Sequence, residues 1–157
     1  AIEAVVAALH GHQGNEAVEN HACEALLFIL SSGNAASFTR AENACAIEAV
    51  LMVMPTQVIP ACMVLGYFCK HSAKNRARAG EAGAVEALVA TQRKHIGNAP
   101  AQANACVALH ILINGNAKNK ARALQAGAKE LVQDTIKAHS GDKGLVEELR
   151  ALLHYMI

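Results

Sequence analysis

The sequence predicts an all-α solenoid, a row of stacked helical repeats, and three observations lead to this class. Two closely similar segments recur, KNRARAGEAGAVEAL from Lys74 and KNKARALQAGAKELV from Lys118. Hydrophobic residues make up 53% of the chain and aromatic residues only 3%, so the apolar side chains are mostly small aliphatic ones that suit close helix packing, whereas typical strand formers are scarce. Apolar residues recur at spacings of three and four, the period of one helix face.

The repeat is a unit of about 44 residues. AIEAVVAAL, AIEAVLMVM, AVEALVATQ and AKELVQDTI begin at Ala1, Ala46, Ala84 and Ala128, which are 45, 38 and 44 residues apart. A second element follows in each unit, as HACEALLFIL, PACMVLGYFC, NACVALHILI and EELRALLHYM. We therefore expect one domain of four units, at about residues 1–33, 34–71, 72–115 and 116–157, the second shortened by about six residues between its elements.

Each full unit reads as a short, a medium and a longer helix. NRARAGEAG and NKARALQAG are predicted to be short helices closed by Gly83 and Gly127, and Cys45 takes the same position in the earlier copy. Between the medium and the longer helix lies a hinge, which reads HQGN, HIGN or HSGD. Its glycines suit a left-handed residue that ends a helix, and the polar residues after them suit caps of the next helix. These hinge positions are Gly14, Gly97 and Gly141, followed by Asn15, Asn98 and Asp142.

Three helices in 40 to 47 residues are typical of the armadillo class of solenoid. ARAGEAGAVEALV resembles the junction of the first and second helices of an armadillo repeat, and NACVALHIL resembles its third helix. The resemblance recurs in register over the whole chain. It implies a right-handed superhelix of about three and a half repeats, because the first unit lacks its short helix. HEAT repeats are the nearest alternative, but they normally lack that separate helix.

The resemblance also implies a concave groove lined by the third helices, where many members clamp an extended peptide with a Trp and, four residues later, an Asn. The Trp position holds Glu24, Met63, Val107 and Arg150, and the Asn position holds Phe28, Tyr67, Ile111 and His154. Because none of these positions holds the expected Trp or Asn, we do not expect binding of extended basic peptides.

The groove positions instead form an apolar stripe with a polar rim that includes Lys70, a pattern typical of an interaction surface. We expect it to bind a protein or peptide partner, as an amphipathic helix. The alternative is that the apolar side chains turn into the core between helices. The expected binding residues are Asn20, Glu24, Phe28, Met63, Tyr67, Val107, His110, Ile111, Arg150 and His154.

Charge and motifs exclude several functions. The formal net charge is +1, which favours neither nucleic acid nor an anionic membrane. Six basic residues recur on two short helices, and we interpret them as a solvated edge, with a site for a phosphate or an acidic peptide as the alternative: Lys74, Arg76, Arg78, Lys118, Lys120 and Arg122. No phosphate-binding loop, metalloprotease motif or nucleophile elbow is present, so we expect neither enzymatic activity nor a cofactor.

Histidines and cysteines are explained by repeat position. His12, His95 and His139 should lie near the ends of the second helices, about 10 Å apart per repeat, too far to share one metal ion. The five cysteines are odd in number and form no C-x-x-C pair, which indicates free thiols in a reducing, cytoplasmic compartment. Three of them hold equivalent positions and should form a buried column: Cys23, Cys62 and Cys106.

The two ends of the chain suggest a second function. No apolar run reaches the roughly 18 residues that cross a membrane, and the first residues do not read as a signal peptide. Because the sequence starts without Met, we expect a piece of a longer chain. Ile2 and Val5 at one end and LRALLHYMI at the other should expose apolar surface, since neither end carries a clear polar cap. Self-assembly end to end is therefore the alternative function, and a regulatory arm of an enzyme is a third.

Overall fold

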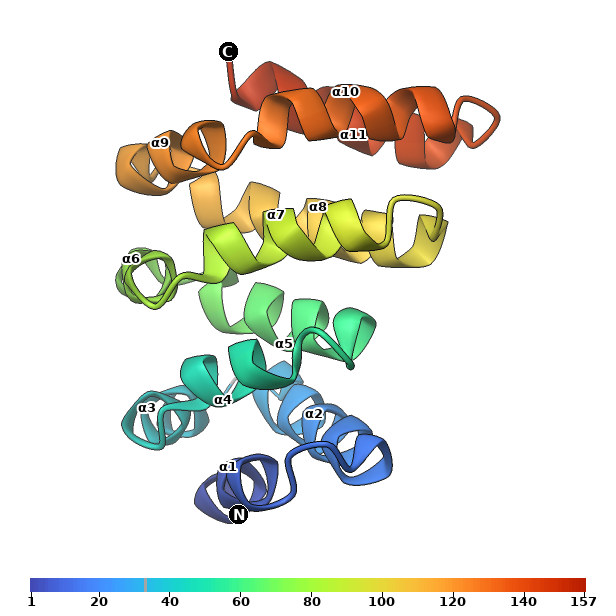
Figure 1. Ribbon diagram of the computed structural model, residues 1–157. Helices are drawn as coiled ribbons and strands as arrows, with labels where there is room; N and C mark the ends of the chain where they lie inside the picture. The colour runs from blue at the N-terminus through green and yellow to red at the C-terminus, as the bar shows by residue number, and fades with distance from the viewer. Residues whose placement is uncertain (33) are drawn as a thin grey trace.

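A computed structural model describes residues 1–32 and 34–157, and this part of the chain contains helices and no strand. Figure 1 shows the helices stacked in a row from the N-terminus to the C-terminus, with the short helices along one edge. The eleven helices of the described residues are α1 (Ile2–Gly11), α2 (Glu16–Ser31), α3 (Ala35–Asn43), α4 (Ala46–Val53), α5 (Val58–Lys70), α6 (Ala73–Glu81), α7 (Ala84–Lys94), α8 (Ala99–Ile113), α9 (Ala117–Gln125), α10 (Ala128–Ala138) and α11 (Lys143–Tyr155). The all-α class is thus confirmed.

The helices follow the order that the repeat predicts. After the pair α1 and α2 come three triplets, starting at α3, α6 and α9, and in the last two a helix of 9 residues precedes one of 11 and then a longer one. The expected shortening lies in the first triplet, where α4 has only 8 residues. The prediction that the hinge itself is shortened is wrong, because residues 54–57 between α4 and α5 are as many as the residues between α7 and α8 or between α10 and α11.

The N-caps predicted from the hinge are present. The side chain of Asn15 accepts a hydrogen bond from the backbone N–H of Val18 at 3.3 Å, and Asn98 and Asp142 do the same for the backbone three residues ahead, both at 3.1 Å. Each of these bonds satisfies a backbone donor that has no partner within the helix. Polar side chains therefore fix the start of every longer helix that follows a complete hinge.

The left-handed positions are only partly as predicted. Gly14, Gly83 and Gly127 have positive φ, and Cys45 also adopts this conformation, with φ of 57°. Gly97 and Gly141 do not, so the prediction for these two hinge glycines is wrong. The hinge closes with the same hydrogen bond in both cases, from Asn98 N to His95 O at 2.9 Å for example, and a β-turn can form this bond with or without positive φ at its third residue.

The core runs along the whole row, because the longer helices α2, α5, α8 and α11 pack on one another in sequence and the medium helices cover them on one side (Figure 1). Leucines that are almost fully buried occur in most of these helices, and each contributes about 1.5–3 kcal/mol by leaving water. The predicted burial of the three equivalent thiols is confirmed, and burial raises the pKa of each thiol: Cys23 to about 11, and Cys62 and Cys106 to about 12.

The two ends match the expectation only in part. Ile2 is buried and Val5 is half-buried, so Ile2 does not contribute exposed apolar surface. The apolar surface at this end is a shallow depression of about 520 Å³ between α1 and α2, lined almost entirely by small aliphatic residues and by His21.

At the other end, Tyr155 and Ile157 are exposed as predicted, whereas Leu149, Leu152 and Met156 turn into the core. The exposed side chains of α10 are mostly polar: Lys129, Glu130, Gln133, Asp134 and Lys137.

Candidate protein-binding surface

Four large apolar side chains are exposed on the longer helices α2, α5 and α8. Phe28 is 78% exposed, Met63 38%, Tyr67 43% and Val107 47%. Phe28 and Tyr67 hold equivalent positions in their repeats, and so do Met63 and Val107, so the four side chains form rows across helices that pack side by side. We call these four residues the third-helix surface. Exposed aromatic and aliphatic side chains gathered in this way are typical of a surface that binds another protein.

Ile111 and His110, two other residues expected in the groove, are half-buried. Ile111 packs against the core, and its Cδ1 lies 3.5 Å from the position that a Cβ on Gly66 would occupy. The alternative in which a side chain turns into the space between helices therefore holds in part for Ile111. His110 is covered by Tyr155 of α11, with the two ring centroids 4.7 Å apart.

Tyr155 was not predicted from the sequence, although it borders this surface. It is 42% exposed, and its hydroxyl donates a hydrogen bond to Asn114 Oδ1 at 2.9 Å. This bond joins the end of α11 to the end of α8. The only signal for Tyr155 in the sequence was an aromatic residue directly after His154, the expected groove residue of the last repeat. Its position over His110 depends on how α11 packs on α8, which the sequence does not give.

The polar residues expected at the rim are all at least partly accessible. Asn20 Nδ2 donates to Glu24 Oε1 at 3.1 Å, which orders these two side chains one turn apart on α2. Lys70, Arg150 and His154 are exposed on the later helices. The rim thus has a negative group near its start and positive groups toward its end, which would favour a partner segment with the opposite order of charges.

The six basic residues of the short helices are mostly engaged within the protein. Three of them pair with glutamates: Lys74 with Glu42 at 2.8 Å, Arg78 with Glu48 at 3.3 Å and Arg122 with Glu86 at 3.1 Å. Arg76 Nη1 donates to Cys69 O at 3.1 Å at the end of α5. These ion pairs join successive repeats and reduce the charge available for an outside anion.

The hinge histidines lie at the helix ends, as predicted, since His12, His95 and His139 are the C-cap residues of α1, α7 and α10. His139 Nε2 lies 2.6 Å from Ile96 O, a carbonyl of the preceding hinge, so this ring joins two repeats. In residues 1–32 and 34–157, no group of three or more His, Cys, Asp or Glu side chains is arranged to hold a metal ion. Over the same residues, no helix is both long enough and apolar enough to span a bilayer.

Comparisons with known proteins give the fold and no family. No protein-family model matches the chain, and no curated protein matches it. Two crystal structures of engineered proteins from the Northeast Structural Genomics Consortium, targets OR366 and OR329, are similar to it over 99% of its length, each with a TM-score of 0.83. Their sequence identities are 24% and 21%, and the chain spans 63% and 62% of their lengths. At these identities the likeness concerns the fold alone.

Proposed function

We propose that this chain is an armadillo-type, right-handed superhelix that acts as a non-enzymatic protein-interaction module. The observation that carries the proposal is the third-helix surface, where Phe28, Met63, Tyr67 and Val107 are exposed on three consecutively packed helices. Burying such side chains against a partner contributes roughly 25 cal/mol per Å² of apolar area. Their adaptable shapes suit a binding surface more than a stability role.

The partner that fits this surface is an amphipathic helix lying along the stack. Neighbouring packed helices are about 10 Å apart, so the exposed anchors recur at about this interval from one repeat to the next. Seven residues of an α-helix span about 10.5 Å, or two turns. A helix with an apolar residue at every seventh position, and others one turn away, would therefore place one anchor on each repeat.

The test is affinity capture with a matched pair of triple variants. In the first, Phe28→Asp, Met63→Asp and Tyr67→Asp place charges on the third-helix surface. The control carries Ile96→Asp, Leu124→Asp and Ile157→Asp, which alter exposed apolar residues outside that surface. A partner retained by the wild type and the control but lost from the first variant supports the proposal, provided that circular dichroism shows all three folded.

A second measurement examines the form of the partner. A peptide from the captured protein that protects the third-helix surface should gain helicity on binding, which circular dichroism detects. Equal capture by both triple variants contradicts the proposed site, and a peptide that remains extended contradicts the helical mode.

A second candidate function is end-to-end assembly, and the depression between α1 and α2 favours it. Small apolar side chains there, Val5 and Val18 among them, leave a face that another helix pair could cover. Sedimentation at increasing concentration tests this. Oligomers that persist in the Phe28, Met63 and Tyr67 variant but vanish with Val5→Lys and Val18→Lys support assembly through this face, whereas a strict monomer rejects it.

A further inference from the structure

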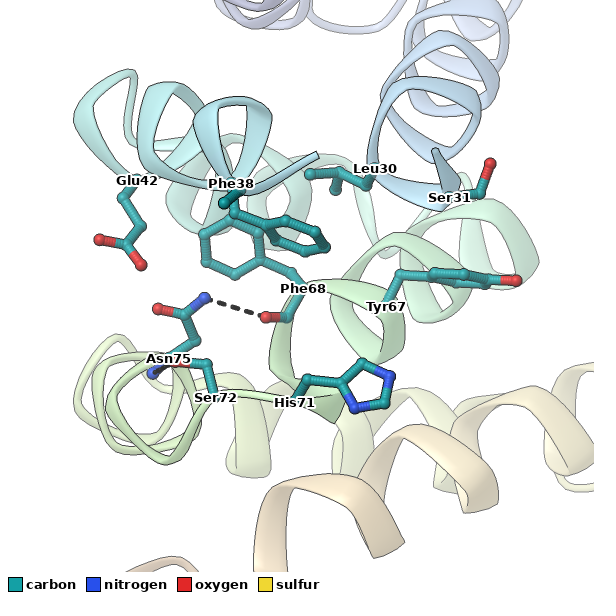
Figure 2. A pocket seen from close by; sticks show the side chains of 10 residues that line it. Leu30, Ser31, Phe38, Glu42, Tyr67, Phe68, His71, Ser72 and Asn75 are labelled. Carbon is teal, nitrogen blue, oxygen red and sulfur yellow. Dashed lines mark hydrogen bonds between the residues drawn. The ribbon is translucent and has the colours of Figure 1, made fainter. Parts of the chain in front are cut away.

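A pocket of about 450 Å³ opens beside the third-helix surface, between the C-terminal ends of α2 and α5 and the short helices α3 and α6 (Figure 2). Three aromatic side chains line it, and the ring centroids of Phe38 and Phe68 lie 6.2 Å apart at an interplanar angle of 38°. Tyr67 belongs both to this pocket and to the third-helix surface. The polar lining includes Glu42 and Asn75.

The pocket exists because one repeat contact is replaced. Between α6 and α9, Asn119 packs against Gly80, and its Nδ2 donates both to Arg76 O at 2.8 Å and to Leu112 O at 2.9 Å. The repeat spacing places Glu42 at the position of Gly80 and Asn75 at the position of Asn119 in the preceding pair of short helices.

A glutamate cannot allow the close approach that glycine allows. Asn75 Nδ2 therefore reaches only Phe68 O, at 3.0 Å, and α3 packs much less closely on α6 than α6 does on α9. The gap that remains is the pocket. The presence of glutamate at position 42, where the next repeat has glycine, accounts for this gap between the helices.

Hydrogen-bond acceptors dominate the wall around Glu42. Asn75 is 1% exposed, and among the described residues its Oδ1 has no hydrogen-bond partner. Figure 2 shows this amide oxygen on the side of the pocket where the Glu42 carboxylate lies. Glu42 Oε2 accepts a hydrogen bond from Lys74 Nζ at 2.8 Å, but the Lys74 side chain is 76% exposed, so solvent weakens this ion pair.

The aromatic faces of Phe38, Phe68 and Tyr67 also attract a cation. The helix ends add little net charge, because ends of both signs line the pocket. The C-terminal turns of α2 and α5 carry a partial negative charge, and the N-terminal turns of α3 and α6 carry a partial positive one. Arg76 Nη1 in addition donates to Cys69 O at the end of α5.

We infer that this pocket binds the guanidinium group of an arginine side chain. A guanidinium is planar, stacks on aromatic rings and presents five donors, which matches aromatic walls beside a carboxylate and an unpartnered amide oxygen. The inference rests on the proposed function in one respect, that the arginine belongs to the partner segment bound on the third-helix surface. Tyr67 places the two sites side by side, so this arginine lies next to an apolar anchor of the partner.

The experiment measures the pocket without any partner protein. NMR spectra of the folded chain are followed during titration with N-acetyl-arginine N-methylamide and, separately, with the corresponding citrulline amide, which has the same shape without the charge. We expect weak, saturable shifts at Phe38, Phe68 and Asn75 with the arginine probe, and binding about tenfold weaker with the citrulline probe. Equal binding of the two probes, or shifts that map away from the pocket, overturns the inference.

Two variants identify the carboxylate that matters. Glu42→Gln should weaken binding of the arginine probe about tenfold, while Glu81→Gln, which removes an exposed carboxylate of α6, should leave it unchanged. Phe28→Asp lies outside the pocket and should also leave the probe bound. If Phe28→Asp loses the partner but still binds the arginine probe, the third-helix surface and the pocket are tested independently of each other. An unaltered affinity in Glu42→Gln overturns the inference.

Discussion

Gly80→Ala tests whether close contact between the short helices holds the repeats together. Gly80 is buried in α6, and a Cβ built on it would overlap Asn119 Oδ1 and lie 2.6 Å from Asn119 Cγ. In an ordinary helix interior the same substitution stabilises by about 0.8–1.0 kcal/mol, because alanine is the better helix former. The sign of the change therefore depends on whether the Asn119 side chain can move.

The packing of Asn119 predicts that it cannot move without loss. It is 2% exposed, and moving it breaks its two hydrogen bonds, each worth about 1 kcal/mol, and leaves a buried amide group without partners at a further 1–3 kcal/mol. After subtraction of the gain in helix propensity, Gly80→Ala should lower the free energy of unfolding by about 2–4 kcal/mol. Urea unfolding followed by circular dichroism measures this change.

Gly66→Ala is the matched control, since Gly66 is also a buried helical glycine. A Cβ there would meet Ile111 Cδ1 at 3.5 Å, an ordinary contact, so this variant should be equal to the wild type or up to about 1 kcal/mol more stable. Asn119→Ala combined with Gly80→Ala should recover part of the loss, giving a favourable coupling energy in a double-mutant cycle. A Gly80→Ala protein as stable as the wild type, or a cycle without coupling, would refute the reasoning.

Three further predictions use the same spectroscopic and chemical tools. Cys45→Gly should raise the free energy of unfolding by up to about 1 kcal/mol, measured by urea unfolding. A left-handed non-glycine residue costs roughly 1–2 kcal/mol, and the greater entropy of glycine in the unfolded state offsets part of the gain. Gly83→Ala, at the equivalent position with φ of 86°, should lower the free energy of unfolding instead, and equal stabilities of variant and wild type would contradict the strain. With a thiol reagent near neutral pH, exposed Cys45 should react at once, and the four buried thiols should react only on unfolding, since burial raises the pKa of each: Cys23, Cys62, Cys69 and Cys106. Rapid reaction of more than one thiol in the native protein would contradict the burial of these four. Two hydrogen bonds from Arg40 lower the pKa of Glu3 to about 2. The small stabilisation from this exposed pair should therefore be present above about pH 4.5 and lost as the pH falls toward 2. An NMR titration in which Arg40→Gln leaves the Glu3 pKa unchanged would exclude Arg40 as the cause.

Most of the helix pattern could be predicted because its causes are local in the sequence. A cap such as Asn98 bonds to a backbone N–H three residues away, and Gly83 or Gly127 closes a short helix through its own φ. The shortening of α4 is visible as a shorter interval between repeats, although the sequence placed the missing residues in the hinge. The wrong prediction at Gly97 and Gly141 shows the limit, since the same hydrogen-bonded turn forms with more than one backbone conformation.

The binding surface was harder to predict, because it depends on contacts between repeats. The period of α8 puts Val107 and Ile111 on one face, but only Val107 projects into solvent, since Ile111 packs against α5 near Gly66. The covering of His110 by Tyr155 depends likewise on the packing of α11 against α8. A single sequence gives the helix face of each side chain but not the distance to its neighbours in the adjacent repeat.

Repeats also allow one unit to serve as the control for another. Where α6 and α9 meet, Gly80 and Asn119 give close packing. Where α3 and α6 meet, Glu42 holds the glycine position beside a pocket, and Asn75 Oδ1 there has no hydrogen-bond partner among the described residues. The backbone is the same kind of helix pair in both places, so the difference is caused by side chains. In a solenoid, stability belongs to the features that recur and binding to the positions that depart from them, because a change that does not serve packing in one unit is tolerated when its neighbours hold the row together.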